Sequence, residues 1–169
     1  MSKQKKNILI IEDSLAVATL IQDFLKKLSY DDIEICTSGR TGIQVFEDLV
    51  NSNKMPVIIL DYSLPDMNAN DIMSELFAIR PNAKIIIESA NEKTDDSIKD
   101  VLRHGAYQYL EKPIRFENIK NTMEILEEED KILENEPENN KEIDSFLKSS
   151  TWISLARISE YSGKKKEEV

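Results

Sequence analysis

The first two-thirds of the chain alternates short apolar runs with segments in which apolar residues recur at every third or fourth position. Short apolar runs predict strands, and these runs lie at residues Asn7–Ile11, Asp32–Cys36, Val57–Leu60, Lys84–Glu88 and Gln108–Leu110. The segments between them have helical spacing, as in Ile21, Phe24 and Leu28. Strands separated by helices in this way predict a parallel sheet.

The predicted strands are apolar almost throughout, which indicates that helices cover both faces of the sheet. This favours an α/β fold, a doubly wound five-stranded parallel sheet, over an antiparallel α+β fold. A closed α/β barrel would need more strand–helix units than the chain length provides. After Pro113, a fifth helix is expected to begin near Arg115 and to run through Ile119, Met123 and Leu126.

The amino-acid composition changes after this helix. Residues 127–142 are acidic, rich in Asn and interrupted by Pro137, a composition typical of a solvated helix end that passes into a linker. Hydrophobic residues return in 143–169, but this segment is too short for a core of its own. We therefore expect a main domain over residues 1–126, an acidic helix end and linker over 127–142, and a helical extension over 143–169.

Composition narrows the classes of function. The formal net charge is −10, and acidic residues outnumber basic ones in 126–169 as well, which argues against direct nucleic-acid binding by this chain. One cysteine, Cys36, and one histidine, His104, provide neither a disulfide nor a zinc site. No apolar run approaches the roughly 20 residues of a membrane span, so we expect a cytoplasmic protein without membrane partners. Cys36 is interpreted as a small buried hydrophobe and His104 as the end of the fourth helix, before Gly105.

Polar residues gather where the predicted strands end. Glu12-Asp13 follow the first strand, Asp61 follows the third, Glu88-Ser89-Ala90 close the fourth, and Glu111-Lys112-Pro113 follow the fifth. In an open parallel sheet, ligands bind outside the carboxyl ends of the strands. The sequence therefore predicts that carboxylates, one hydroxyl and one ammonium converge at one edge of the sheet.

Such a group of carboxylates is unfavourable without a cation, because two unit charges about 4 Å apart repel by roughly 4 kcal/mol at an effective dielectric near 20. A hard divalent ion resolves the repulsion, and Mg²⁺ typically binds one or two protein carboxylates together with a phosphate. Asp61 is then a candidate nucleophile toward phosphorus. The metal and Lys112 would neutralise the charge on the phosphoryl oxygens.

Each of these residues also has a purely structural interpretation. Asp61 could start a turn before Pro65, and Glu12-Asp13 could cap the first helix. Ser89 could be an ordinary hydroxyl at a strand end, and Lys112 a surface lysine. It is their joint occurrence, in order at the ends of four strands, that favours a phosphoryl site.

Four motifs in register resemble the receiver domain of two-component response regulators over about residues 5–125. They are "NILIIEDS", "VIILDYSLPDMNA", "IIIESA" and "GAYQYLEKP". The resemblance implies the flavodoxin-like receiver fold with strand order 2-1-3-4-5 and a sensor histidine kinase as partner. It implies that Asp61 is the phospho-acceptor, that Lys112 contacts the phosphoryl group, and that the Lys112–Pro113 peptide bond is cis. It also implies that Mg²⁺ is held by Glu12, Asp13, Asp61 and the backbone carbonyl of Ser63.

The same resemblance implies a switch. Ser89 would bind a phosphoryl oxygen and Tyr109 would turn inward, remodelling the face made by the fourth helix, fifth strand and fifth helix. Ser63 and Asn91 occupy the positions that tune dephosphorylation in the family; neither is a carboxylate, so we expect a phosphoryl lifetime that is not unusually short. Ala69 stands where the family usually has Gly, and a positive φ there would strain the backbone.

The C-terminal segment leaves two interpretations open. The run from Leu155 to Ser159, with Gly163 four residues on, resembles the first helix and turn of a helix-turn-helix, but the chain ends at Val169 before a second helix is complete. The alternative is a helical hairpin that docks on the main domain or on a second copy. A homodimer would then form through the extension or through the switch face.

Three functions follow from these interpretations. The first is a phosphorylation switch that controls a partner or a dimer and catalyses only its own phosphorylation and slow dephosphorylation. The second is a DNA-binding transcriptional response regulator whose output part is truncated or incomplete. The third, a phosphatase with Asp61 as nucleophile, is disfavoured because such enzymes need a second Asp where Ser63 stands.

Overall fold

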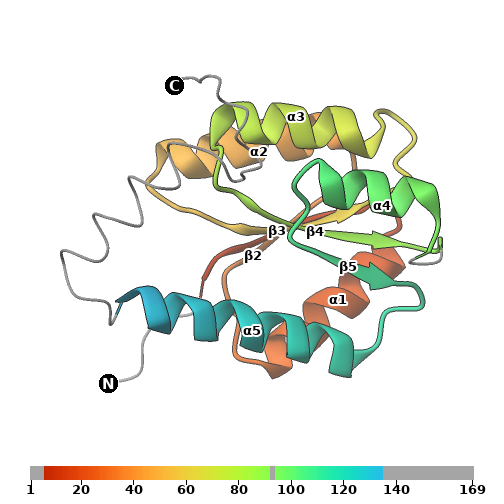
Figure 1. Cartoon of the computed structure of the whole chain (residues 1–169). Helices are drawn as coiled ribbons and strands as arrows, with labels where there is room; N and C mark the ends of the chain where they lie inside the picture. Colours follow the sequence, from red (N-terminus) through yellow and green to blue (C-terminus); the bar gives the residue numbers. More distant parts are fainter. Residues whose placement is uncertain (1–5, 92–93, 135–169) are drawn as a thin grey trace. The chain divides into compact units, whose positions relative to one another are not determined.

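The computed structural model describes residues 6–91 and 94–134 and contains a five-stranded parallel sheet. The strands are β1 (Ile8–Ile11), β2 (Ile33–Cys36), β3 (Val57–Asp61), β4 (Lys84–Ser89) and β5 (Gln108–Glu111). Their order is β2-β1-β3-β4-β5, and all four neighbouring pairs are parallel (Figure 1). The predicted doubly wound sheet and its strand order are confirmed.

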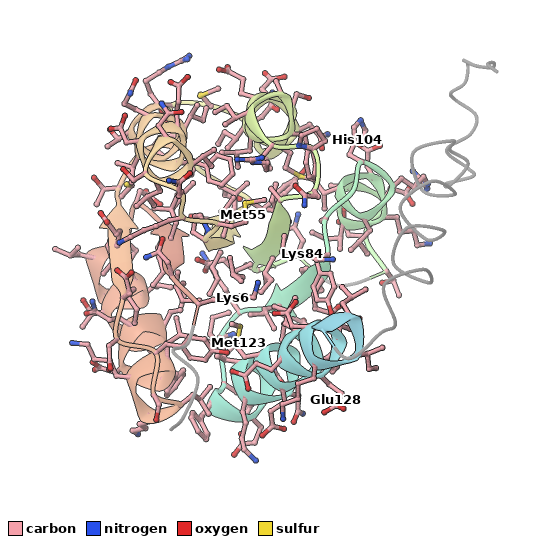
Figure 2. All side chains as sticks on the ribbon, turned by 90° about the vertical axis from the view of Figure 1, so that its left-hand side faces the viewer. Lys6, Met55, Lys84, His104, Met123 and Glu128 are labelled. Atoms are coloured by element: carbon pink, nitrogen blue, oxygen red, sulfur yellow. The ribbon has the colours of Figure 1, made fainter. Side chains whose placement is uncertain are left out.

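Helices cover both faces of this sheet. They are α1 (Leu15–Lys27), α2 (Gly39–Asn51), α3 (Ala69–Ile79), α4 (Asp96–Arg103) and α5 (Phe116–Glu134). Within residues 6–123, α1 and the first part of α5 lie on one face, and α2, α3 and α4 lie on the other (Figure 1). Phe24 of α1 meets Phe116 of α5 edge to face, with ring centroids 5.7 Å apart. Figure 2 views the end of the sheet where strands begin, marked by Lys6, Met55 and Lys84.

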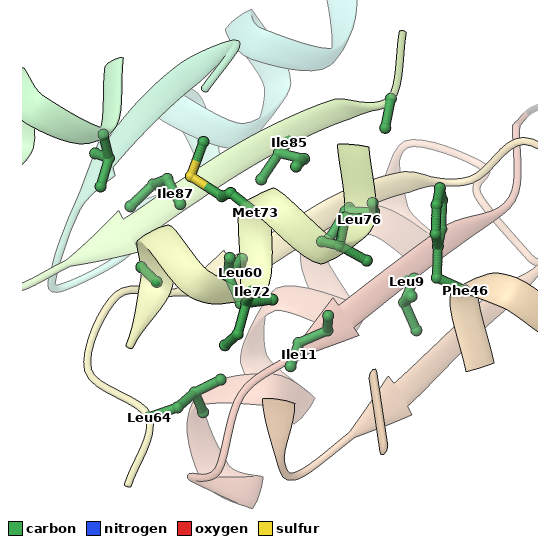
Figure 3. Close-up of a cluster of buried hydrophobic side chains, with 14 of the residues drawn as sticks. Leu9, Ile11, Phe46, Leu60, Leu64, Ile72, Met73, Leu76, Ile85 and Ile87 are labelled. Atoms are coloured by element: carbon green, nitrogen blue, oxygen red, sulfur yellow. The ribbon is translucent and has the colours of Figure 1, made fainter. Parts of the chain in front are cut away.

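The core follows from the alternation of side chains along the strands. Leu9 and Ile11 of β1, Leu60 of β3, and Ile85 and Ile87 of β4 point toward α2 and α3, where they pack on Phe46, Ile72, Met73 and Leu76 (Figure 3). All of these side chains are at most 1% exposed. Full burial of such a side chain contributes about 1.5–3 kcal/mol. This packing holds the strands in the register that aligns their carboxyl ends.

Side chains mark where the helices begin and end. Ser14, Asn68 and Asp95 are the N-caps of α1, α3 and α4, and each side chain accepts a hydrogen bond from a backbone N–H in the first turn of its helix. Helix α4 ends at Arg103 with His104 as its C-cap, at the predicted place, and Gly105 follows with φ of 116°, a backbone conformation that favours glycine.

Helix α2 has an additional cap from a distant part of the chain. Ser38 accepts from the N–H of Thr41 at 3.1 Å. The two carboxylate oxygens of Asp66 accept from the N–H groups of Gly39 at 2.9 Å and Arg40 at 3.0 Å. These bonds lower the pKa of Asp66. The loop after β3 is thereby tied to the start of α2.

One expectation about the loop after β3 was wrong in detail. Asp61 does not follow the strand but is its last residue, because the ladder continues: Asp61 pairs with Glu88, and the N–H of Tyr62 donates to the Glu88 carbonyl at 2.9 Å. Ala69 is not strained. It is the first residue of α3, buried beneath the Asn68 cap, and the non-glycine residues with positive φ in the described chain are Ser29 and Asn53.

Helix α5 begins at Phe116, within one residue of the predicted start, and continues to Glu134. The chain divides into two units between Met123 and Glu124, and of the second unit the structure describes the helical residues 124–134. The second half of the predicted acidic segment 127–142, residues 135–142, and the whole extension, 143–169, lie outside the described residues. Among the helices that are described, none is long and apolar enough to cross a membrane.

Candidate phosphoryl-acceptor site

Four strands deliver the predicted polar residues to the same edge of the sheet. Glu12 follows β1 and is 1% exposed, Asp61 ends β3 at 2%, and Ser89 ends β4 at 1%. Lys112 directly follows β5 and is partly exposed, while Asp13 is exposed. The parallel register explains this convergence, since Ile11 is level with Leu60 and Asp61 with Glu88.

Three of the carboxylates form a compact cluster of oxygens. One ligand oxygen from each of Glu12, Asp13 and Asp61 lies within 4.8 Å of the other two. The backbone fixes two of these carboxylates: the N–H of Ser14 donates to Glu12 Oε2 at 2.9 Å, and the N–H of Ser63 donates to Asp61 Oδ1 at 3.1 Å. Burial raises the pKa of Glu12, although the bond from Ser14 opposes this. The cluster has the oxygen donors of a hard-cation site.

The ammonium of Lys112 lies against this cluster. Its Nζ is 3.3 Å from Glu12 Oε1, 3.3 Å from Asp61 Oδ1 and 3.6 Å from Glu88 Oε1. Burial alone would lower the pKa of Lys112, yet the charges of Glu88, Asp61 and Glu12 outweigh burial and raise it. The lysine is therefore charged at neutral pH. Its own N–H donates to the Ser89 carbonyl at 2.8 Å, and the Lys112–Pro113 bond is cis, as predicted.

Glu88 lies beside this cluster and contacts the same ammonium of Lys112, although sequence reasoning assigned it no role in the site. It is fully buried, and burial, reinforced by the charge of Glu12, raises the pKa of its carboxyl to about 9. The signal was present in the sequence: Glu88 follows three consecutive isoleucines and stands two positions after Ile86, and residues at that spacing share a face of the sheet.

The predicted switch residues meet on the side of the site formed by β4 and β5. The hydroxyl oxygen of Ser89 accepts from the N–H of Asn91 at 3.0 Å. Tyr109 is buried, 8% exposed, and its hydroxyl donates to the carbonyl of Asn91 and lies 3.5 Å from that of Ser89. Strand β5 is thus linked directly to the loop that follows Ser89.

Cys36 and His104 take no part in this cluster. Cys36 is buried at the end of β2, and burial raises the pKa of its thiol to about 11, so the thiol is protonated and inert at neutral pH. The prediction that it is a buried hydrophobe is confirmed. The ring Nδ1 of His104 lies 2.8 Å from the carbonyl oxygen of Asp100, four residues earlier at the end of α4.

Sequence comparison connects this site with a known family. The family model described as "Response regulator receiver domain" matches residues 8–124. The chemotaxis protein CheY of Thermotoga maritima is 28% identical over 110 residues, which are 65% of this chain and 88% of CheY. The luminescence regulatory protein LuxO of Vibrio campbellii is 29% identical over 143 residues, which are 83% of this chain but 30% of LuxO. The aligned part thus spans most of CheY and less than a third of LuxO.

Solved structures show the same fold. The receiver domain of a putative LuxO repressor from Vibrio parahaemolyticus has a TM-score of 0.62 and 30% identity, and covers 72% of this chain and 88% of that one. A CheX–CheY–BeF3–Mg complex from Borrelia burgdorferi has a TM-score of 0.65 and 20% identity, and covers 72% and 89%. Because its identity to this chain is only 20%, the Borrelia burgdorferi complex shows that the fold is shared and nothing further.

Receiver domains are signalling switches rather than classical enzymes, and the acidic cluster around Asp61 fits phosphorylation of an aspartate. The family match covers more than half of the chain, and strand order, buried acids and Lys112 agree with it. The chain therefore belongs to the response regulator receiver domains of two-component signalling.

Proposed function

We propose that this chain is a Mg²⁺-dependent phosphorylation switch that accepts a phosphoryl group on Asp61 from a sensor histidine kinase in the cytoplasm. The observation that carries the proposal is the position of Asp61. Its carboxylate is 2% exposed at the end of a central strand, 3.3 Å from an ammonium and next to two further acids. A buried strand end gains no stability from this concentration of charge, whereas phosphoryl transfer requires it.

The donor set fits Mg²⁺. Glu12, Asp13 and Asp61 would supply carboxylate oxygens, and Ser63 its backbone carbonyl. Glu12 Oε1 is a buried oxygen that accepts no hydrogen bond and has the Lys112 ammonium 3.3 Å away, so it has room for a bond to a cation. When bound, the ion supplies positive charge opposite the phosphoryl oxygens. Receiver domains bind Mg²⁺ at their acidic pocket, and membership of that family supports the same role for these residues.

In the proposed reaction, an oxygen of Asp61 attacks the phosphorus of a phosphohistidine. The new O–P bond forms while the N–P bond breaks, and the imidazole nitrogen leaves with the electron pair and takes a proton from solvent. The ammonium of Lys112, already 3.3 Å from Asp61 Oδ1, neutralises charge on the transferred oxygens. Its charge is secured by the surrounding carboxylates, which raise its pKa.

The output depends on Ser89 and Tyr109. We propose that the Ser89 hydroxyl binds a phosphoryl oxygen and that this stabilises the buried position of Tyr109, which contacts the loop through the Asn91 carbonyl. The face formed by α4, β5 and the start of α5 would then control a partner or a second copy. Neither Ser63, which is exposed, nor Asn91 can act as a general base on water, so the phosphoryl lifetime would not be unusually short.

No observation favours a second function. The residues of the DNA-binding alternative, from Leu155 to Val169, lie outside the described part of the chain. The phosphatase alternative needs an Asp where Ser63 stands. LuxO is named a regulatory protein, but this chain spans less than a third of it, so the output of the whole protein stays a proposal.

Intact mass after incubation with Mg²⁺ and acetyl phosphate tests the proposal. We expect one added phosphoryl group on the wild type and none on Asp61→Asn. The control is Asp31→Asn, which makes the same change at an exposed acid before β2, at the opposite end of the sheet, and should be phosphorylated like the wild type. Size-exclusion chromatography of the same samples would show whether phosphorylation changes the oligomeric state. A wild type that remains unmodified with every donor and metal would refute the proposal.

A further inference from the structure

Glu88 is a buried acid in the site to which the proposed function gives no role. Its side chain is fully buried, and neither Oε1 nor Oε2 accepts a hydrogen bond in the described structure. Its one oppositely charged neighbour among the described residues is Lys112, whose Nζ lies 3.6 Å from Oε1. The ladder places Glu88 level with Asp61 on the adjacent strand.

Lys112 contacts three carboxyl groups, and Glu88 differs from the other two. Glu12 and Asp61 belong to the cluster whose oxygens lie within 4.8 Å of one another, and Glu88 does not. A cation held by that cluster would compete with the ammonium for Glu12 and Asp61. Glu88 would then be the carboxyl that can retain Lys112. An oxygen of Glu88 can accept from the ammonium whether the carboxyl carries a proton or not.

Stability does not account for an acid at this position. A buried polar side chain with unsatisfied oxygens is costly, and an apolar residue of the same shape is often neutral or stabilising instead. Ile86, which shares the face of Glu88 on β4, is apolar and 1% exposed. An apolar residue would therefore fit the strand, and the acid is better explained by its contact with Lys112.

We propose that Glu88 is a positioning residue for Lys112: it holds the ammonium at the buried side of the site while Glu12 and Asp61 bind the cation and the phosphoryl group. The inference rests on the proposed function and deepens it. Glu88 itself need not touch the phosphoryl group, since Lys112 makes that contact.

The test uses fluoroberyllate, a phosphoryl mimic that binds without a kinase, with Mg²⁺ and ¹⁹F NMR detection on the full chain. Glu88→Met removes the acceptor at nearly constant shape, and Glu88→Gln keeps an acceptor oxygen. The control Glu111→Met deletes an exposed acid at the end of β5, beside Lys112 in sequence. We expect Glu88→Met to bind about tenfold more weakly, while Glu88→Gln and Glu111→Met stay within about threefold of the wild type.

A double-mutant cycle separates positioning from a general effect on the fold. In a Lys112→Ala background, Glu88→Met should cause no further loss of fluoroberyllate binding, because the group it positions is gone. Urea unfolding should show Glu88→Met to be as stable as the wild type or more stable. Equal binding by Glu88→Met and the wild type would overturn the proposal. So would a loss of the same size in the Lys112→Ala background, or a Glu88→Gln variant as weak as Glu88→Met.

A second readout keeps this test independent of the proposed function. The side-chain ¹³Cε signal of Lys112, assigned by its disappearance in Lys112→Ala, should move in Glu88→Met and stay near its wild-type position in Glu88→Gln, with or without Mg²⁺. A wild type that binds no fluoroberyllate, together with a Lys112 signal that moves as expected, would refute phosphoryl binding but retain the positioning role. An unmoved Lys112 signal would refute the positioning role.

Discussion

Glu88 should cause the fold to lose stability as the pH rises, and Glu88→Gln should remove that loss. Burial, reinforced by the charge of Glu12, raises the pKa of Glu88 from 4.5 to about 9. Between these values the unfolded chain releases the proton while the folded protein retains it. The stability associated with Glu88 is therefore fully present below pH 4.5 and is lost as the pH rises toward 9.

The magnitude follows from the same two pKa values. Each pH unit in this window changes the free energy of unfolding by about 1.4 kcal/mol. At pH 7, about 2.5 units above the ordinary value, the loss reaches about 3 kcal/mol, and its limit near pH 9 is about 6 kcal/mol. Glu12, whose pKa is also raised, interacts with Glu88, so the two carboxyls titrate together and share this pH dependence.

The assay is urea unfolding followed by far-UV circular dichroism between about pH 5.5 and 8.5, with EDTA present so that metal binding does not contribute. The substitution Glu88→Gln shifts the free energy of unfolding by an amount that does not depend on pH, since an amide does not titrate. The quantity that matters is the difference in slope against pH between wild type and variant. We expect the wild type to lose about 2–4 kcal/mol more than Glu88→Gln over this range.

Glu111→Gln is the matched control, because it removes an exposed carboxyl at the end of the neighbouring strand β5. Its curve should run parallel to that of the wild type. Parallel curves for the wild type and Glu88→Gln would refute the reasoning, since they would show that Glu88 is ionised equally in the folded and unfolded states.

Three further substitutions test the fold around the site. Asp66→Ala removes the carboxylate that caps α2 at 2.9 and 3.0 Å, and urea unfolding should show a loss of about 1–2 kcal/mol; an unchanged midpoint would show that water replaces this cap. Gly42→Ala would place a methyl group 2.5 Å from Cδ1 of Ile11, and urea unfolding should show about 1–3 kcal/mol of destabilisation; an unchanged midpoint would show that β1 can shift to make room. Tyr109→Phe deletes the hydroxyl that donates to the Asn91 carbonyl, and should cost about 1 kcal/mol by the same assay; no cost would mean that this bond contributes nothing.

The strands, the helices and the edge of the sheet that carries the chemistry could all be predicted from the amino-acid sequence. This was possible because the period of apolar residues is a local property. The predicted strand bounds differ from those observed by one residue. The convergence of Glu12, Asp61 and Lys112 also followed from sequence, because parallel strands bring their carboxyl ends to one edge.

How these groups meet depends on the assembled fold. Lys112 and Asp61 are 51 positions apart, and Asp66 caps a helix 26 and 27 positions earlier. Such contacts depend on packing between elements, which periodicity does not encode. The absence of strain at Ala69 likewise follows from its place at the start of α3 rather than from its residue type. The protonation of Glu88 could not be predicted for the same reason: its pKa is set by complete burial next to Glu12 and Lys112, which exists only once the strands have assembled.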